Sequence, residues 1–153
     1  MQIAPRGVLA AFIIAPAFAA LVCVIGMMIH FVTTDPAGAE LPVGELMPMA
    51  ASIWVSALMF AYPAALAFAV LWLAAGAVRL PGGAVIAGAV SGFAAMAVYL
   101  DRISEGGLVE GLAGGQPLAD LTLSQLAGAL ALPLIAAASG AIGGLAFSAF
   151  ARR

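Results

Sequence analysis

Four long apolar runs without aspartate, glutamate, lysine or arginine, separated by short polar segments, dominate the pattern of this chain. They cover about residues 8–32, 49–78, 83–100 and 121–150. At a rise of ~1.5 Å per residue, a helix of each length crosses or nearly crosses the ~30 Å hydrocarbon core of a bilayer. The pattern therefore predicts an all-α membrane protein, a four-transmembrane-helix bundle that forms a single integral membrane domain over residues 1–153.

The segments between the runs predict how the spans are connected. Residues 79–83 are predicted to form a tight turn. So short a link can join only two antiparallel neighbouring helices. Residues 33–48 and 101–120 are rich in proline and glycine, which is typical of irregular loops. The spans are therefore predicted to form two antiparallel hairpins, each with its long loop on the same side of the membrane.

The charges divide between the two sides of the predicted bundle. The side with the termini and the 79–83 turn carries four arginines and no acid, whereas the other side carries Arg102 and all seven acids. Short loops rich in arginine stay in the cytoplasm. We therefore expect both termini to be cytoplasmic, with two acidic outer loops, in the plasma (inner) membrane of a bacterium.

The start of the chain permits a second interpretation, a secretory signal peptide. Arg6 would be its basic region and Ala17-Phe18-Ala19 its small-residue cleavage site. The apolar run continues for thirteen residues beyond that site, to Val32. A signal peptide ends its apolar region at the cleavage site, so a membrane span is the favoured interpretation.

Composition supports the membrane assignment and excludes several classes of protein. The chain is 65% hydrophobic and 8% charged, whereas soluble domains carry about 25% charged residues. The lipid bilayer is therefore its first expected partner. Cys23 is the single cysteine, so neither an intrachain disulfide nor a cysteine metal cluster is predicted. No basic run suggests nucleic acid.

Glycines at small-xxx-small spacing mark the predicted helix-packing faces. Gly88 and Gly92 form one such step in the third span, and Gly140 and Gly144 form another in the fourth. Helices associate in lipid where small residues let two backbones approach closely. The favoured function is thus a membrane subunit or scaffold that packs through these faces, with other membrane subunits or with itself as a homo-oligomer.

Candidate chemistry is sparse, and the sequence predicts no enzyme, cofactor, catalytic residue or metal site. His30 is the one ionisable group within the spans apart from cysteine and tyrosine, and such a group is a functional candidate. With Tyr99, Asp101 and Arg102 it forms a possible outer-face site. The alternative is an interfacial histidine that faces headgroups and water. An enzyme that acts on lipid would have to use His30 and the loop acids.

Prolines suggest a second function. Three spans carry one each: Pro16, Pro63 and Pro133. Kinked helices around a straight, glycine-faced one would leave a central cavity. The alternative is therefore a small homo-oligomeric transporter or channel for a neutral or apolar solute. A continuous cavity lined by Ser91, Tyr62 and Ser139 would favour this alternative, whereas a solid bundle would favour partner binding.

Overall fold

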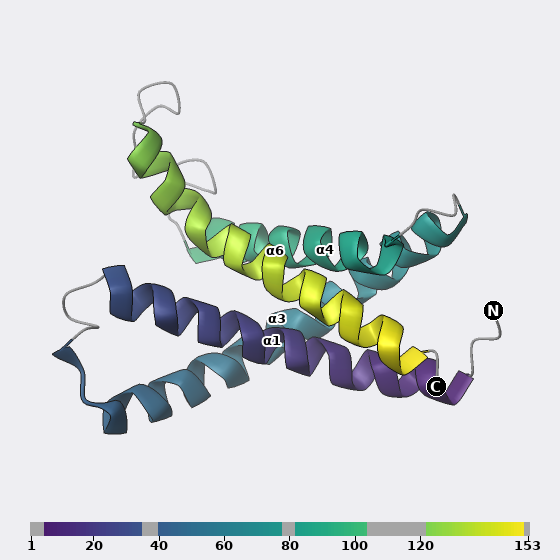
Figure 1. Ribbon diagram of the computed structural model, residues 1–153, viewed down its shortest axis with the longest axis horizontal. Coiled ribbons are helices and arrows are strands. Elements are labelled where there is room, and N and C mark those ends of the chain that lie inside the picture. Colours follow the sequence, from purple (N-terminus) through teal and green to yellow (C-terminus); the bar gives the residue numbers. More distant parts are fainter. Residues whose placement is uncertain (1–4, 35–39, 78–81, 104–121, 152–153) are drawn as a thin grey trace.

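The computed structural model describes residues 5–34, 40–77, 82–103 and 122–151. This part of the chain contains four long helices, α1 (Pro5–Thr34), α3 (Val43–Ala77), α4 (Gly83–Ile103) and α6 (Leu123–Ala151) (Figure 1). Each helix includes a stretch that is long and apolar enough to cross a membrane. The predicted fold class, an all-α bundle of four candidate transmembrane helices, is therefore confirmed.

The four helices pack in a ring, and each contacts mainly two neighbours. Helix α4 packs against α6, α6 against α1, α1 against α3, and α3 against α4. The starts of α1 and α4 and the ends of α3 and α6 lie together at the right of Figure 1. We call this the termini end of the bundle and the opposite end the loop end. At the loop end the α1–α3 hairpin and the α4–α6 hairpin diverge in the same view.

Helix α3 begins at Val43, well before the start of the span expected at residue 49. The backbone N–H groups of Glu45 and Leu46 bond to the Pro42 carbonyl, at 2.9 and 3.3 Å, and form the first turn. An acidic residue there is favourable because it faces the positive end of the helix dipole. Part of the segment expected to be an irregular loop is therefore helical.

Helix α4 likewise extends past the expected end of its span at residue 100 and stops at Ile103. Asp101 and Arg102, expected to be the first residues of a loop, therefore lie in its last turn. At its other end the helix follows Gly82, whose φ of +71° lies in the left-handed region that glycine adopts without strain. The Gly82 carbonyl accepts the N–H of Val85 at 2.8 Å.

A dense aromatic cluster fills the termini end of the bundle. The ring of Phe147, which is 2% exposed, contacts the rings of Phe12, Phe68 and Trp72 edge-on, each with centroids 5.0 Å apart. Edge-to-face contacts at this distance are the favoured geometry of aromatic pairs. Three helices (α1, α3 and α6) are therefore fixed together at this end by one buried ring.

The outward faces of the helices are apolar and exposed. On α3, Met59 is 75% exposed and Leu66 is 73% exposed. In water such a surface would be costly, at about 25 cal/mol per Å² of apolar area, whereas in hydrocarbon it costs nothing because lipid tails are as apolar as leucine. The distribution of exposed side chains therefore fits a chain whose solvent is the bilayer.

Candidate functional site

The four glycines predicted to pack helices lie in one interface, between α4 and α6. A Cβ atom added to Gly88 would overlap the Gly140 carbonyl oxygen, and one added to Gly144 would overlap the carbonyl oxygen of Ala84. A Cβ added to Gly92 would overlap the carbonyl oxygen of Ala136. The two backbones are thus in direct contact, and the glycines pack within one chain.

Two buried serines flank this interface, and their hydroxyl groups are bonded within their own helices. Ser91, which is 5% exposed, donates to the Ala87 carbonyl at 2.7 Å, and Ser139, which is 3% exposed, donates to the Ile135 carbonyl at 2.7 Å. In the described part of the chain, every buried side-chain nitrogen and oxygen has a hydrogen-bond partner. The serines therefore present oxygen acceptors, but no free proton, to their surroundings.

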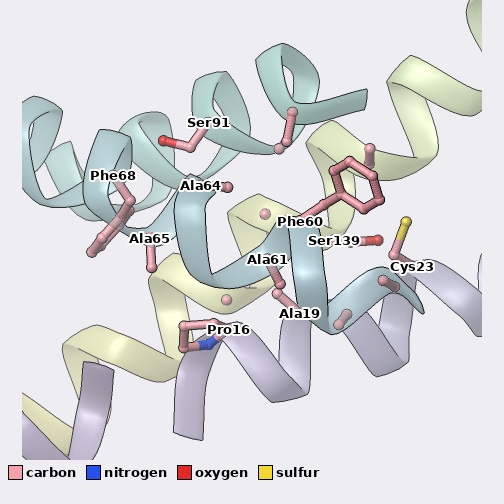
Figure 2. Close-up of a pocket in the computed structure, with 18 of the residues that line it drawn as sticks. Pro16, Ala19, Cys23, Phe60, Ala61, Ala64, Ala65, Phe68, Ser91 and Ser139 are labelled. Atoms are coloured by element: carbon pink, nitrogen blue, oxygen red, sulfur yellow. The ribbon is translucent and has the colours of Figure 1, made fainter. Parts of the chain in front are cut away.

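A cavity of about 190 Å³ lies between the four helices, all of which contribute to its lining. The space arises because α3 turns a face of small side chains toward it. That face consists of Ala57, Ala61, Ala64 and Ala65. Positions i, i+4, i+7 and i+8 share one side of a helix. Figure 2 shows three of these alanines on α3 above Pro16 and Ala19 of α1.

The cavity is closed at one end and partly open beside α3. At the termini end it reaches the aromatic cluster, where Phe12, Phe68 and Phe147 all line it. Among its described lining residues, Ser56 and Phe60 are the ones that remain exposed, and both belong to α3. The opening therefore lies along α3, toward the loop end and away from the aromatic cluster.

The lining is almost entirely apolar. None of the described residues that line the cavity is acidic, basic or a histidine. The polar side chains are three serines, Tyr99 and the Cys23 thiol, which interacts with Ser139 across the α1–α6 interface. Because an unpaired charge in such surroundings costs several kcal/mol or more, the cavity suits a neutral ligand.

The structure describes the possible outer-face site only in part. Tyr99 lines the cavity, and its ring contacts that of Phe60 edge-on at 5.1 Å. His30 lies near the end of α1, outside the cavity lining, and its carbonyl accepts the hydroxyl group of Thr34. Asp101 and Arg102 lie in the last turn of α4. The described part of the cavity lining includes Tyr99 from this set.

Two of the three polar residues expected to line a cavity do so. Ser91 and Ser139 are in its lining, whereas Tyr62 is not. The Tyr62 hydroxyl group instead donates to the carbonyl of Ile13, at 3.3 Å, in α1. Trp54 makes a similar bond from its indole N–H to the Ala17 carbonyl, at 3.4 Å. These two bonds join α3 to α1 next to the cavity.

The described residues contain no candidate metal-binding site. They contain no group of three or more histidine, cysteine, aspartate or glutamate side chains that converge on one point. The acids expected in the outer loops fall largely outside the described residues, with Glu40, Glu45 and Asp101 as exceptions. The cavity therefore remains the best-defined candidate for a functional site.

Sequence reasoning missed the main lining element, the alanine face of α3. Its signal was present, since Phe60 and Phe68 bracket Ala61, Ala64 and Ala65 on a single side of the helix.

Comparison of the chain with protein-family models, with curated proteins and with solved structures found no match. Its function must therefore be argued from the cavity itself.

Proposed function

We propose that this protein is a non-catalytic polytopic membrane protein that binds a neutral, apolar small molecule in the cavity between its four helices. The observation that carries the proposal is the cavity lining, which comes from all four helices and contains no charged side chain among the described residues. Apolar cavities of about 150 Å³ stay dry and take up small hydrocarbons. A cavity of this size and composition is suited to the same kind of ligand.

The scaffold hypothesis loses its main support for a simple reason. It rested on Gly88, Gly92, Gly140 and Gly144 as surfaces for a partner or for a second copy. These glycines face one another across the α4–α6 interface of the same chain, so they cannot also receive another helix. The alternative was a small homo-oligomeric transporter or channel for a neutral or apolar solute. The cavity favours the ligand class of that alternative, and because all four helices of one chain line it, the site does not require an oligomer.

The aromatic cluster favours a binding protein or carrier over an open channel. A channel needs a path through both ends of the bundle, but Phe147 is fully packed among Phe12, Phe68 and Trp72 at the termini end. A ligand that enters beside α3 would stop at these rings. Passage to the other side would require the rings to separate, as in a carrier that alternates between two states.

We further propose that the termini end faces the cytoplasm of a bacterium and that the protein resides in the inner membrane. The support is the charge pattern, with Arg6, Arg79, Arg152 and Arg153 on that side and the acids on the other. The cavity would then open toward the outer leaflet, because Ser56 and Phe60 lie away from the termini end.

A fluorescence titration tests the proposed function. N-phenyl-1-naphthylamine, a neutral apolar dye, is titrated into nanodiscs that hold the protein, and the signal of empty nanodiscs is subtracted. The proposal predicts saturable binding of one dye per chain. Ala64→Phe fills the cavity and should weaken binding at least tenfold, whereas Ala67→Phe, at an exposed position of the same helix, should leave it unchanged.

Either of two results would overturn the proposal. One is a signal from protein-containing nanodiscs that never saturates above that of empty nanodiscs. The other is equal dye binding by the two phenylalanine variants when both elute as a single symmetrical peak with unchanged helical content. The matched pair separates loss of the cavity from a general effect of adding a ring to α3.

A further inference from the structure

We infer that the ligand is a single straight acyl chain of a membrane lipid, inserted from the side of α3 with its terminal methyl group toward Phe147. This inference rests on the proposed function and names the class of ligand. Four observations carry it: the surroundings of the opening, the length of the cavity, its closed end, and the bonding state of its hydroxyl groups.

The opening faces the hydrocarbon phase. Ser56 and Phe60, the exposed members of the lining, each follow an exposed apolar residue of α3: Val55 is 60% exposed and Met59 is 75% exposed. In the bilayer these side chains are surrounded by acyl chains. An unfilled apolar cavity forfeits the dispersion contacts of its lining, and water gains little there. The molecules present at the highest concentration beside this opening are lipid chains.

The cavity is long and narrow. Its lining extends along α6 from Ala136 to Phe147 and along α1 from Phe12 to Met27, which corresponds to about 16 and 22 Å at the rise of an α-helix. A volume of about 190 Å³ over that length has the cross-section of one chain rather than two. Because an extended chain zigzags, each carbon–carbon bond of about 1.5 Å advances it by only roughly 1.3 Å, so a chain of roughly fourteen carbons spans the shorter distance.

The closed end fixes the direction of the chain. Phe147 and Phe68 seal the cavity with apolar rings, which offer nothing to a polar headgroup. Toward the other end the lining includes Tyr99, whose hydroxyl group gives the ring one polar edge beside Phe60. Rings of this kind favour the membrane interface. The headgroup therefore belongs at the loop end and the methyl group at the aromatic cluster.

The polar lining groups do not demand a polar ligand. Ser91 and Ser139 direct their protons to carbonyls of their own helices, and Ser56 does the same toward the Ser52 carbonyl at 3.1 Å. None of these three hydroxyl groups loses a hydrogen bond when hydrocarbon fills the cavity. An acyl chain therefore leaves no buried donor unsatisfied. It avoids the usual penalty for covering serine with apolar atoms, which is the loss of a hydrogen bond by the hydroxyl group.

Photolabelling with chain-terminal diazirines tests the inference. The protein is reconstituted with a trace of phosphatidylcholine, or of free fatty acid, that carries a diazirine at the end of one straight chain. After illumination, labelled positions are mapped by mass spectrometry. We expect label on Phe147 or Phe68, which are 2% and 8% exposed and are therefore out of reach of surrounding lipids. Labelling by either probe supports the acyl chain, and the more efficient probe identifies its source.

Variants and a second readout keep the outcomes distinct. Ala64→Phe should reduce labelling of Phe147 at least fivefold while exposed Leu66 and Leu145 label as before, and Ala67→Phe should change neither. Label confined to exposed positions with both probes would overturn the inference. If the neutral dye still binds saturably in that case, the cavity takes another apolar ligand and the proposed function stands. If the dye also fails to bind, both fall.

Discussion

Gly88 and Gly140 face each other so closely that neither has room for a side chain: a Cβ atom on either would overlap the carbonyl oxygen of the other. This reciprocal contact fixes α4 against α6 as the tightest pair of helices. It also positions Ser91 and Ser139, which are one helical turn or less from the contact in sequence, at the cavity wall. The rest of the bundle, and α3 above all, packs around this pair more loosely.

The first prediction concerns this contact. Gly88→Ala or Gly140→Ala forces two backbones apart and should destabilise the protein by about 1–3 kcal/mol, the usual cost of overpacking. Gly128→Ala is the matched control, because a Cβ there meets nothing within 4 Å and alanine favours a helix by up to ~1 kcal/mol over glycine. Thermal unfolding in mild detergent measures both effects. Equal melting temperatures for the three variants would contradict the packing described.

The second prediction concerns the aromatic cluster. Phe147→Ala leaves a void among three rings, and at about 24 cal/mol per Å³ of residual cavity it should cost roughly 2 kcal/mol. Phe18→Ala, at a position that is 44% exposed, removes the same atoms from the lipid-facing surface and should cost under about 0.5 kcal/mol. Unfolding midpoints for the two variants in the same detergent provide the comparison. A larger loss from Phe18→Ala would show that the cluster does not hold the helices together.

The architecture was accessible from the sequence, because hydrocarbon imposes a simple pattern on a chain. A charge is costly in the bilayer, so long uncharged runs identify spans, and glycines spaced four apart identify faces where backbones meet. What the pattern does not specify is the partner of each face. Gly88 and Gly140 carry the same signal whether they meet each other, a second copy or another protein.

The alanine lining of the cavity was harder to foresee for a related reason. Alanine is so frequent in this chain that the face with Ala57, Ala61 and Ala64 does not stand out, and small residues predict close packing as readily as a void. Tyr62 shows another limit: it was expected at the cavity wall, but its hydroxyl group reaches the Ile13 carbonyl instead. Such outcomes depend on how far α3 stands from its neighbours, which no local pattern encodes.

The third prediction tests the contacts that hold α3 to α1. Tyr62→Phe removes the bond to the Ile13 carbonyl and should cost about 0.6 kcal/mol, the average for hydrogen bonds between membrane helices. Trp54→Phe should lower the stability by a similar amount for the lost hydrogen bond to the Ala17 carbonyl, and further through the lost packing contacts of the larger indole ring. A double-mutant cycle with both changes should be close to additive, because their acceptors, Ile13 and Ala17, are separate carbonyls. Strong coupling between the two changes would mean that the bonds form as one unit.

The fourth prediction concerns orientation. In a Cys23→Ala background, Gly38→Cys should react with a membrane-impermeant maleimide in intact cells, and Pro81→Cys should react only after the inner membrane is opened. The reason is the proposed topology, in which the arginine-rich segments of the sequence stay in the cytoplasm. The reverse pattern would invert the bundle and place the opening of the cavity on the cytoplasmic side.

Protection of Cys23 tests the central claim most directly, because this single thiol lines the cavity. The rate of its modification by N-ethylmaleimide, a small neutral reagent, is measured in nanodiscs with and without N-phenyl-1-naphthylamine. The account predicts that saturating dye slows the reaction at least fivefold in the wild-type protein and in Ala67→Phe. A reaction rate unchanged by saturating dye would mean that the cavity is not where an apolar ligand binds.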